Sequence, residues 1–345
     1  MIKRPIALLM NDLHISKDNI LEFEKNWNEA LSVCKARNIT NMFIGGDMFT
    51  TRNVQYLMPV KTVMKCLEKA SLDGVKTTIS FGNHDCPVYG EKDNWCSILS
   101  HISGVEIVDD IKVIDDINCS KVLVMIAYFP EETMMEEKLT ELDDMLAKCG
   151  VSCSDVILYI HAGVHGALGD FDVPNEMPQE PLLKYGRVLC AHYHNRTVIK
   201  NTNIEYIGSS RAHTFGEDEE KGYTILYNNG DTEFVKNEVN TRYITDDVML
   251  ENLADWENVY DKRYKVRLRI HCTSAEADTV DKDKLFERGA NKIEFVTEKL
   301  QAIEASQTAL EEKFDNKNLQ IEYKSFCKEK DIDSRFGIDY LNKTK

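Results

Sequence analysis

The chain has 345 residues, which exceeds one average domain, and 43% of them are hydrophobic, enough to bury a full core. It carries 42 Lys and Arg against 58 Asp and Glu, and this net charge of -16 does not fit a stand-alone nucleic-acid binder held by phosphate contacts. Its ten cysteines include no C-x-x-C pair, which argues against a thiolate metal site and favours free thiols in a reducing compartment. No run approaches the roughly 18 to 20 apolar residues of a membrane span, so we expect a cytoplasmic protein with no membrane partner.

The first part of the chain alternates between apolar, strand-like runs and amphipathic helices. Strands are expected at 6–10, 41–44 and 75–81. The helix expected at 20–37 carries Leu21, Trp27, Leu31 and Cys34 on one stripe, with Asn38 as its C-cap. The helix expected at 54–70 carries Leu57, Val60, Val63, Met64 and Leu67 at helical spacing. This β-α-β-α-β order predicts a doubly wound unit whose strand tips share one edge.

The middle of the chain is richer in short strands, which are expected at 105–108, 122–126, 156–160 and 188–190, and a further strand and turn are expected at 204–210. A charged helix is expected at 131–149, and the loop at 162–186, rich in glycine and proline, is a candidate for substrate contacts. Residues 223–235 predict a hairpin, in which Asn229-Gly230 would supply a type I′ turn.

A composition change near Thr245 suggests a domain boundary. Beyond it, the run 264–270 alternates apolar and basic residues as a half-buried strand does, and 292–296 is its expected partner. From about residue 298 the chain is expected to be helical and is highly charged. We therefore predict three parts, at residues 1–245, 246–297 and 298–345.

Five of the predicted strands end at polar side chains that can bind metals or transfer protons. These are Asp12 and His14 after the first strand, Asp47 after the second, Asn83, His84 and Asp85 after the third, His161, and the pair His192 and His194. Taken alone, each has an ordinary interpretation as a turn residue, a helix cap or a core histidine. Because open α/β sheets place their ligand crevice at the carboxyl ends of strands, five such endings together indicate one shared site.

The residue types indicate which metals this site would bind. Imidazoles, carboxylates and one amide, without a thiolate, suit Mn²⁺, Fe²⁺ or Zn²⁺. Seven candidate ligands exceed the needs of one ion, which predicts two divalent ions bridged by a carboxylate, a clamp suited to in-line displacement at phosphorus. Asp47, on the middle strand of the first three, is the natural bridge.

In this order, Asp12-x-His14, Gly46-Asp47, Gly82-Asn83-His84-Asp85, His161 and His192-x-His194 resemble the calcineurin-like metallophosphoesterase superfamily over roughly the first 215 residues. The resemblance implies an α/β (α+β) fold, a metallophosphoesterase β-sandwich flanked by helices. It implies one metal, most commonly Mn²⁺, on Asp12, His14, Asp47 and His194, and a second on Asp47, Asn83, His161 and His192. It makes His84 a catalytic histidine outside the ligand set, oriented by Asp85, which stabilises the transition state or protonates the leaving oxygen.

Further motifs narrow the resemblance. Tyr206-Ile207-Gly208-Ser209, Phe215-Gly216-Glu217 and Lys221-Gly222-Tyr223 resemble the SbcD-type DNA repair exonuclease subunits, and the chain's size resembles the phage recombination endonuclease subunits among them. Thr50 and Ala191 depart from the usual Asp or His and the usual Gly of that family, and neither departure removes a ligand.

This narrower resemblance implies a DNA nuclease, with exonuclease or endonuclease activity, that works with an SbcC-type coiled-coil ATPase in recombination and double-strand-break repair. The small strand-rich part would be the capping domain, and the helical tail would dock the ATPase. A homodimer is compatible with it, and a phage-encoded chain would act in the host cytoplasm.

Two other functions remain open. A small-molecule phosphodiesterase or phosphatase would use the same dinuclear centre, and the acidic charge favours it, but it has no use for residues 246–345. A non-catalytic scaffold would tolerate the loss of ligands, whereas all seven are present. In the tail, a narrow apolar stripe suits a two-helix contact better than a globular core, and it is formed by Leu300, Ile303, Leu310 and Phe314. Two interpretations stay open, a contact with the partner ATPase and a contact with the chain's own capping domain.

Overall fold

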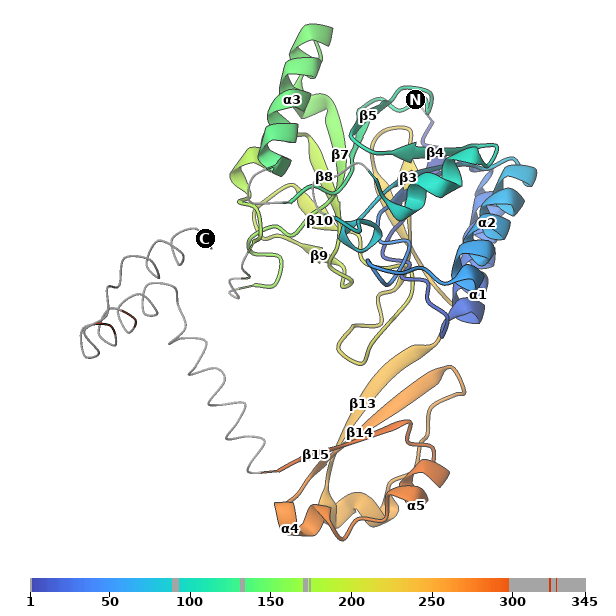
Figure 1. Cartoon of the computed structure of the whole chain (residues 1–345), viewed down its shortest axis with the longest axis vertical. Coiled ribbons are helices and arrows are strands. Elements are labelled where there is room, and N and C mark those ends of the chain that lie inside the picture. The colour runs from blue at the N-terminus through green and yellow to red at the C-terminus, as the bar shows by residue number, and fades with distance from the viewer. Residues whose placement is uncertain are drawn as a thin grey trace. The chain divides into compact units, whose positions relative to one another are not determined.

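The computed structural model describes residues 2–88, 93–130, 134–169, 173, 175–297, 323 and 327. The chain divides into two compact units, residues 1–243 and 244–345, and the composition change near Thr245 lies beside this division (Figure 1). The proposed split of the second unit into a capping domain and a docking tail stays a prediction, because the tail stripe lies outside the described residues. No helix in the described part of the chain is long and apolar enough to cross a membrane.

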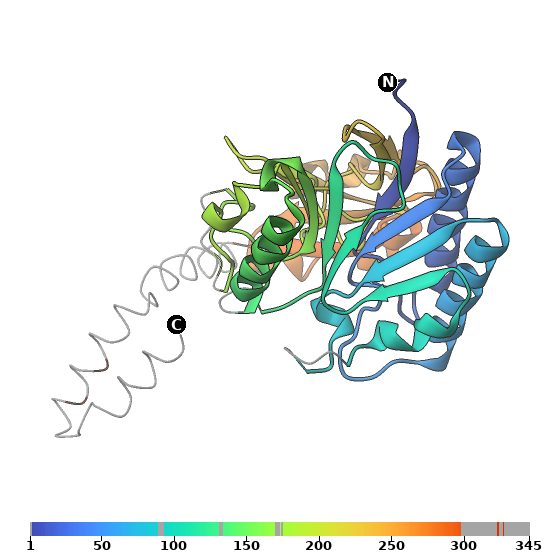
Figure 2. The ribbon, with the colours of Figure 1, turned by 90° about the horizontal axis from the view of Figure 1, so that it is seen from above.

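The first unit contains two six-stranded mixed sheets. The first sheet has the order β12-β11-β1-β2-β3-β4. Its strands are β1 (Pro5–Met10), β2 (Asn41–Gly45), β3 (Lys76–Ser80), β4 (Val105–Val108), β11 (Gly222–Tyr227) and β12 (Thr232–Lys236). The first four are parallel, and β11 runs antiparallel to β1. Helices α1 (Ile20–Arg37) and α2 (Leu57–Leu72) lie together on one side of this sheet (Figure 2).

The second sheet has the order β5-β6-β7-β8-β10-β9. Its strands are β5 (Ile111–Ile114), β6 (Val122–Ile126), β7 (Val156–His161), β8 (Arg187–Ala191), β9 (Thr197–Val198) and β10 (Ile204–Tyr206). Strands β6, β7, β8 and β10 are parallel, and helix α3 (Met134–Cys149) covers the side away from the first sheet (Figure 2). Four 3-10 turns, at Asn83–Asp85, Trp95–His101, Cys153–Asp155 and Glu180–Leu182, connect these elements.

The two sheets form a sandwich because their central strands are apolar on both faces. In β1, Leu9 belongs to the cluster between the sheets, together with Phe43 of β2 and Tyr159 of β7. Its neighbour Leu8 points the other way and belongs to the cluster that includes Trp27 of α1. Successive strand side chains alternate between faces, so a continuous apolar run fills both layers at once. The predicted α/β architecture of sheets flanked by helices is confirmed.

The helix at 20–37 is confirmed to the residue, and Asn38 caps it in the left-handed conformation, at φ 54°. Two members of the predicted apolar stripes are wrong, because Leu21 is 72% exposed and Leu57 is 71% exposed. Leu21 lies on a different side of α1 from Phe23 and Trp27, which are buried. Leu57 is the first residue of α2, which begins three residues later than the sequence predicted.

The predicted hairpin exists, but its turn differs. Of the two turn residues only Gly230 has a positive φ, 86°, whereas a type I′ turn needs positive φ at both central residues. Gly230 N–H donates to the carbonyl of Tyr227, whose own N–H donates to the carbonyl of Asp231, at 2.9 Å each. This pattern is typical of a type I turn with a glycine bulge.

The second unit contains a three-stranded sheet of β13 (Arg242–Met249), β14 (Tyr264–His271) and β15 (Lys292–Val296). Along β14, Val266, Leu268 and Ile270 are buried and alternate with less buried residues, as the sequence predicted. β15 pairs with β14 in parallel, and this pairing was also predicted. The unit further contains α4 (Ser274–Ala277), α5 (Lys282–Glu287) and a 3-10 turn at Leu250–Asp255.

Candidate metal centre

The polar strand endings of the two sheets meet at one edge of the first unit. The loop after β1 runs beside the loop after β2, since the N–H of Asp12 donates to the Gly46 carbonyl at 3.0 Å and that of His14 to the Asp47 carbonyl at 2.9 Å. Asn83 follows β3 in the same parallel sheet. His161 ends β7 and His192 follows β8 in the second sheet. All seven predicted ligands therefore come from the carboxyl ends of parallel strands.

The backbone is strained at this edge. Left-handed φ angles occur at Asp12 (51°), His14 (43°), Asp47 (53°) and His192 (99°). In the described part of the chain, the other non-glycine residues with positive φ are all asparagines, which tolerate this conformation more readily than most residues. Because each such residue costs on the order of 1 to 3 kcal/mol, their concentration among predicted ligands indicates that function maintains the geometry.

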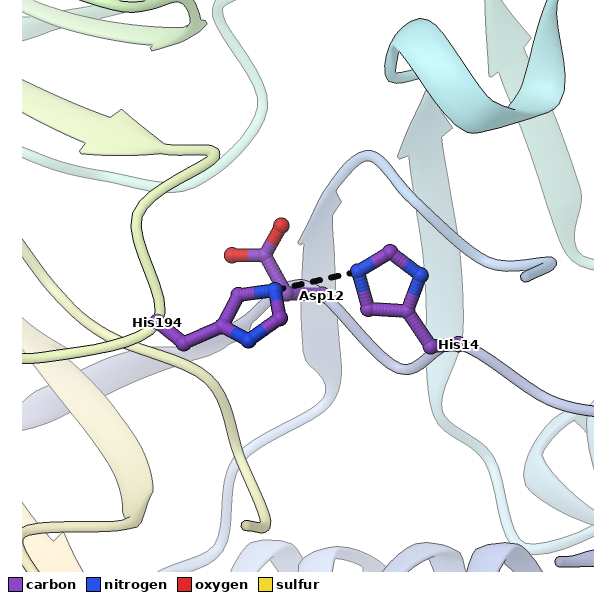
Figure 3. Close-up of side chains that lie close together, drawn as sticks. All are labelled: Asp12, His14 and His194. Atoms are coloured by element: carbon purple, nitrogen blue, oxygen red, sulfur yellow. Dashed lines mark hydrogen bonds between the residues drawn. The ribbon is translucent and has the colours of Figure 1, made fainter. Parts of the chain in front are cut away.

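Asp12, His14 and His194 form the first group, in which one ligand atom of each lies within 4.8 Å of the others. Figure 3 shows the two imidazoles directed at each other beside the carboxylate, with the two Nε2 atoms 3.1 Å apart. Oδ1 of Asp12 is buried and has no hydrogen-bond partner among the described residues. A buried carboxylate oxygen without a donor is costly, and a cation between these three side chains would satisfy it.

Asn83, His161 and His192 form the second group. Nδ1 of His161 donates to the Gly45 carbonyl at 2.9 Å, so in the neutral ring Nε2 carries a lone pair. That atom faces Oδ1 of Asn83 at 3.0 Å, and Nδ1 of His192 lies 3.2 Å from the same oxygen. In the neutral tautomer of each ring that leaves this nitrogen unprotonated, three lone pairs converge on one point, which is the arrangement that a metal ion completes.

Asp47 lies between the two groups. Its Oδ2 atom is 3.5 Å from Nε2 of His14, in the first group, and 3.5 Å from Nε2 of His161, in the second. Its Oδ1 atom accepts a hydrogen bond from the backbone N–H of His84 at 2.9 Å. Asp47 is 2% exposed, so its carboxylate is held in the position that the sequence analysis gave to a bridge.

Burial and neighbouring charges shift the pKa values of the predicted ligands. Burial lowers the pKa of His14 to about 4, and burial together with the charge of His161 lowers the pKa of His192 to about 3. Burial would raise the pKa of Asp12, but the neighbouring His161, His194 and His14 hold it below its usual value. His14 and His192 are therefore neutral at neutral pH, the form in which an imidazole binds a divalent cation. Burial alone would lower the pKa of His161 and of His194, but Asp47 and Asp12 raise that of His161, and the hydrogen bond to Glu217 raises that of His194, so a cation bound there would displace a proton. The buried Asp and His side chains could hold metal ions.

His84 lies at the centre as the sequence predicted, but Asp85 does not orient its ring. Nδ1 of His84 donates instead to the carbonyl of Thr50 at 2.7 Å. The carboxylate of Asp85 accepts hydrogen bonds from the backbone N–H groups of Gly82, Met48 and Phe49, at 2.9 to 3.1 Å. Asp85 thus ties the loop after β3 to the loop after β2, and it positions Asp47 and His84 through the backbone.

Several supporting residues were missed by sequence reasoning. The amide of Asn11 donates to Asp12 Oδ2 and to the Gly208 carbonyl, and the hydroxyl of Tyr159 donates to Asn11 Oδ1 at 3.0 Å. The only sign of the role of Asn11 in the sequence is that it adjoins a predicted ligand. Tyr159 lies in an apolar strand of the other sheet, and nothing in the sequence indicates its role. Its ring needs Gly45, because a Cβ there would lie 2.4 Å from the Tyr159 ring.

A scan against protein-family models finds no match to this chain, and a search of curated proteins finds no similar sequence. Among solved structures, TT1561 of Thermus thermophilus is 11% identical and aligns with 68% of this chain and 99% of its own, at a TM-score of 0.43. Another solved chain matches with the same identity and coverage at a TM-score of 0.42. At this level of similarity, a function has to be assigned from the side chains of the site itself.

Proposed function

We propose that this protein is a metal-dependent phosphodiesterase, and that it acts on DNA as a nuclease subunit. The observation that carries the proposal is the convergence of imidazole nitrogens from both groups of ligands on Asp47, together with the buried and unpartnered Oδ1 of Asp12. An oxygen- and nitrogen-rich site of this kind, at the carboxyl ends of parallel strands, suits hydrolysis at phosphorus better than redox or thiol chemistry.

In this proposal, two divalent ions are held by the ligand sets that the sequence predicted. Asp12, His14, Asp47 and His194 would hold one, and Asp47, Asn83, His161 and His192 the other. Bound at this place, such ions lower the pKa of water and neutralise charge on phosphoryl oxygens. The protein's contribution is rigidity, because strained backbone and buried hydrogen bonds fix each ligand before the ion arrives.

His84 is the proposed catalytic residue. Its backbone N–H donates to Asp47 and its Nδ1–H donates to Thr50, so both the main chain and the ring are fixed. The other ring nitrogen, Nε2, can carry the proton that a departing alkoxide oxygen requires, or can donate a hydrogen bond to a charged phosphoryl oxygen. Thr50 replaces the acidic or imidazole residue common in the resembling family, yet its backbone carbonyl still orients this histidine.

The sequence resemblance supports DNA as the substrate, Mn²⁺ as the metal and an SbcC-type ATPase as the partner. The second unit supports the same choice, because a simple phosphatase has no use for it. A net charge of -16 means that the chain would gain much of its DNA affinity from that partner. The same charge favours the competing function, hydrolysis of small phosphodiesters that need no basic surface.

One assay separates these functions. Purified protein is incubated with linear duplex DNA, single-stranded DNA and a chromogenic phosphodiester, each with Mn²⁺ and with Mg²⁺, and Asp47→Asn serves as the inactive control. We expect metal-dependent cleavage of both DNA and the chromogenic ester. Cleavage of the ester with no activity on either DNA, also after an SbcC-type ATPase is added, would leave the small-molecule function, and inactivity on all three substrates would refute the proposal.

The partner is tested by deleting residues 298–345. We expect the shortened protein to hydrolyse the chromogenic ester at nearly the full rate but to lose association with an SbcC-type ATPase and ATP-stimulated cleavage of duplex DNA. Undiminished association of the shortened protein would contradict the assignment of the tail.

A further inference from the structure

Glu217 belongs to neither predicted ligand set, yet its carboxylate reaches one of the ligands. Oε1 of Glu217 lies 3.2 Å from Nδ1 of His194, and the glutamate side chain is 7% exposed. Because a carboxylate only accepts, His194 donates from Nδ1, and in the neutral ring its Nε2 carries the lone pair. That lone pair is the one directed toward His14 and Asp12. Glu217 therefore sets which nitrogen of His194 is free to bind a cation.

The carboxylate of Glu217 is itself held in place. The backbone N–H groups of His213 and Thr214 donate to Oε1 at 3.2 and 3.1 Å. Oε2 pairs with Nζ of Lys221 at 3.2 Å, and the Lys221 side chain is fully buried. The same ammonium donates to the His194 carbonyl at 2.6 Å and to Oδ1 of Asn195 at 2.9 Å. The Glu217–Lys221 pair thus holds the ring of His194 through one member and its backbone through the other.

Two other histidines of the site are oriented by uncharged groups. Nδ1 of His161 and Nδ1 of His84 donate to the backbone carbonyls of Gly45 and Thr50, which are uncharged. A carboxylate partner adds negative charge and raises the basicity of the ligating nitrogen, and loss of such a partner typically weakens metal binding by about 10- to 100-fold. The only buried lysine in the described part of the chain takes part in this arrangement.

We propose that Glu217, held by Lys221, is a positioning residue of the metal centre, which fixes the ring of His194 and strengthens it as a ligand of the ion bound with Asp12 and His14. The inference rests on the metal-binding part of the proposed function and not on the choice of substrate. The alternative is a purely structural role, in which Glu217 only neutralises the charge of the buried Lys221 and does not affect metal binding.

The test uses isothermal titration calorimetry, in which the metal-free, full-length protein is titrated with Mn²⁺. We expect Glu217→Gln to weaken one Mn²⁺ site by about 10- to 100-fold. Glu220→Gln is the matched control, because it removes the same charge from the same loop at a side chain that is 57% exposed, and it should bind Mn²⁺ like the wild type. Wild-type affinity in Glu217→Gln would overturn the inference.

Glu217→Gln removes the nearer carboxylate partner of a buried ammonium and leaves it with Asp218, which is 3.6 Å away and 40% exposed, and this loss can prevent folding. The double variant Glu217→Gln with Lys221→Met removes both charges and is compared with Lys221→Met alone. If Glu217 positions His194, the double variant should bind Mn²⁺ about 10- to 100-fold more weakly than Lys221→Met alone. Equal affinities would assign Glu217 a structural role only. Because the readout is binding, a wild type that binds Mn²⁺ but hydrolyses no phosphodiester would refute the proposed function alone, and a wild type that binds no Mn²⁺ would refute both.

Discussion

His14 and His161, which come from different sheets, meet at a single atom, since Nε2 of each lies 3.5 Å from Oδ2 of Asp47. Neither distance is a hydrogen bond. Two imidazole nitrogens that approach one carboxylate oxygen at this separation leave room for cations between them. The relationship joins the two halves of the sandwich through one side chain, and it makes Asp47 the residue whose loss affects both groups of ligands.

Asp47→Ala should therefore weaken every bound metal ion and abolish hydrolysis. The loss of affinity should exceed the ~10- to 100-fold typical of a residue that only supports a ligand, because a bridge contacts both ions directly. Metal content of the dialysed variant, measured by mass spectrometry, and hydrolysis of a chromogenic phosphodiester check this. A variant that retains full activity, or a wild type that stays active after exhaustive chelation, would exclude the two-metal mechanism.

His84→Ala separates chemistry from metal binding. Both fixed contacts of His84 run to the protein, through its backbone N–H and Nδ1, so the ion count should stay at the wild-type value. Turnover should fall by about 10²- to 10⁴-fold, the scale of a positioned acid or electrostatic group. His84 also lies within 4.8 Å of ligand atoms of His14 and Asp47. If metal content falls together with activity, His84 is a ligand and not an acid.

The location of the site could be predicted from the sequence because it depends on a local pattern. Each apolar strand that ends in Asp, Asn or His marks its own tip, and parallel strands bring the tips together. The strand and helix positions followed from periodicity in the same way. Both features could be predicted because they need no knowledge of which distant residues touch.

The orientation of the site side chains was not predictable, because distant backbone supplies it. His84 was expected to be oriented by its neighbour Asp85, but the 3-10 turn at Asn83–Asp85 aims that carboxylate at N–H groups of the loop after β2. His194 and Glu217 are 23 positions apart in the sequence, and the short strands β9 and β10 lie between them. No periodicity encodes such contacts. Leu21 shows the same limit for packing, since its apolar character does not reveal which face of α1 meets the sheet.

The environment of Glu22, which lies outside the metal centre, should make the stability of the fold depend on pH. Burial alone would raise the pKa of this carboxyl, but hydrogen bonds from Lys25, Asn240 and the backbone N–H of Thr241 lower it to about 2, against 4.5 for the free side chain. A lowered pKa stabilises the folded state above pH 4.5, and this contribution disappears as the pH falls from 4.5 toward 2. The bonds tie the first turn of α1 to the segment that precedes β13.

Glu22→Gln should therefore lower the free energy of unfolding by about 1 to 2 kcal/mol at pH 7, and the difference from wild type should shrink between about pH 4.5 and pH 3. Urea unfolding at a series of pH values measures it. Glu68→Gln, at an exposed position of α2, should change stability by less than about 0.5 kcal/mol. A difference for Glu22→Gln that is as large at pH 3 as at pH 7 would show that the charge of Glu22 is not responsible.

Gly82 should be irreplaceable for a steric reason. Its backbone permits any residue, with φ at -102°, but a Cβ at this position would lie 2.1 Å from Oδ1 of Asp47 and 2.6 Å from Cε1 of His161. Gly82→Ala must displace both of these side chains or shift its own backbone, at a cost of about 1 to 3 kcal/mol for overpacking. We expect Gly82→Ala to lose metal binding and hydrolysis, while its free energy of unfolding falls only moderately. In Gly216→Ala, where the nearest atom to the new methyl group would be 3.8 Å away, both activities should persist. Normal Mn²⁺ affinity in Gly82→Ala would mean that Asp47 and His161 are not held where this structure has them.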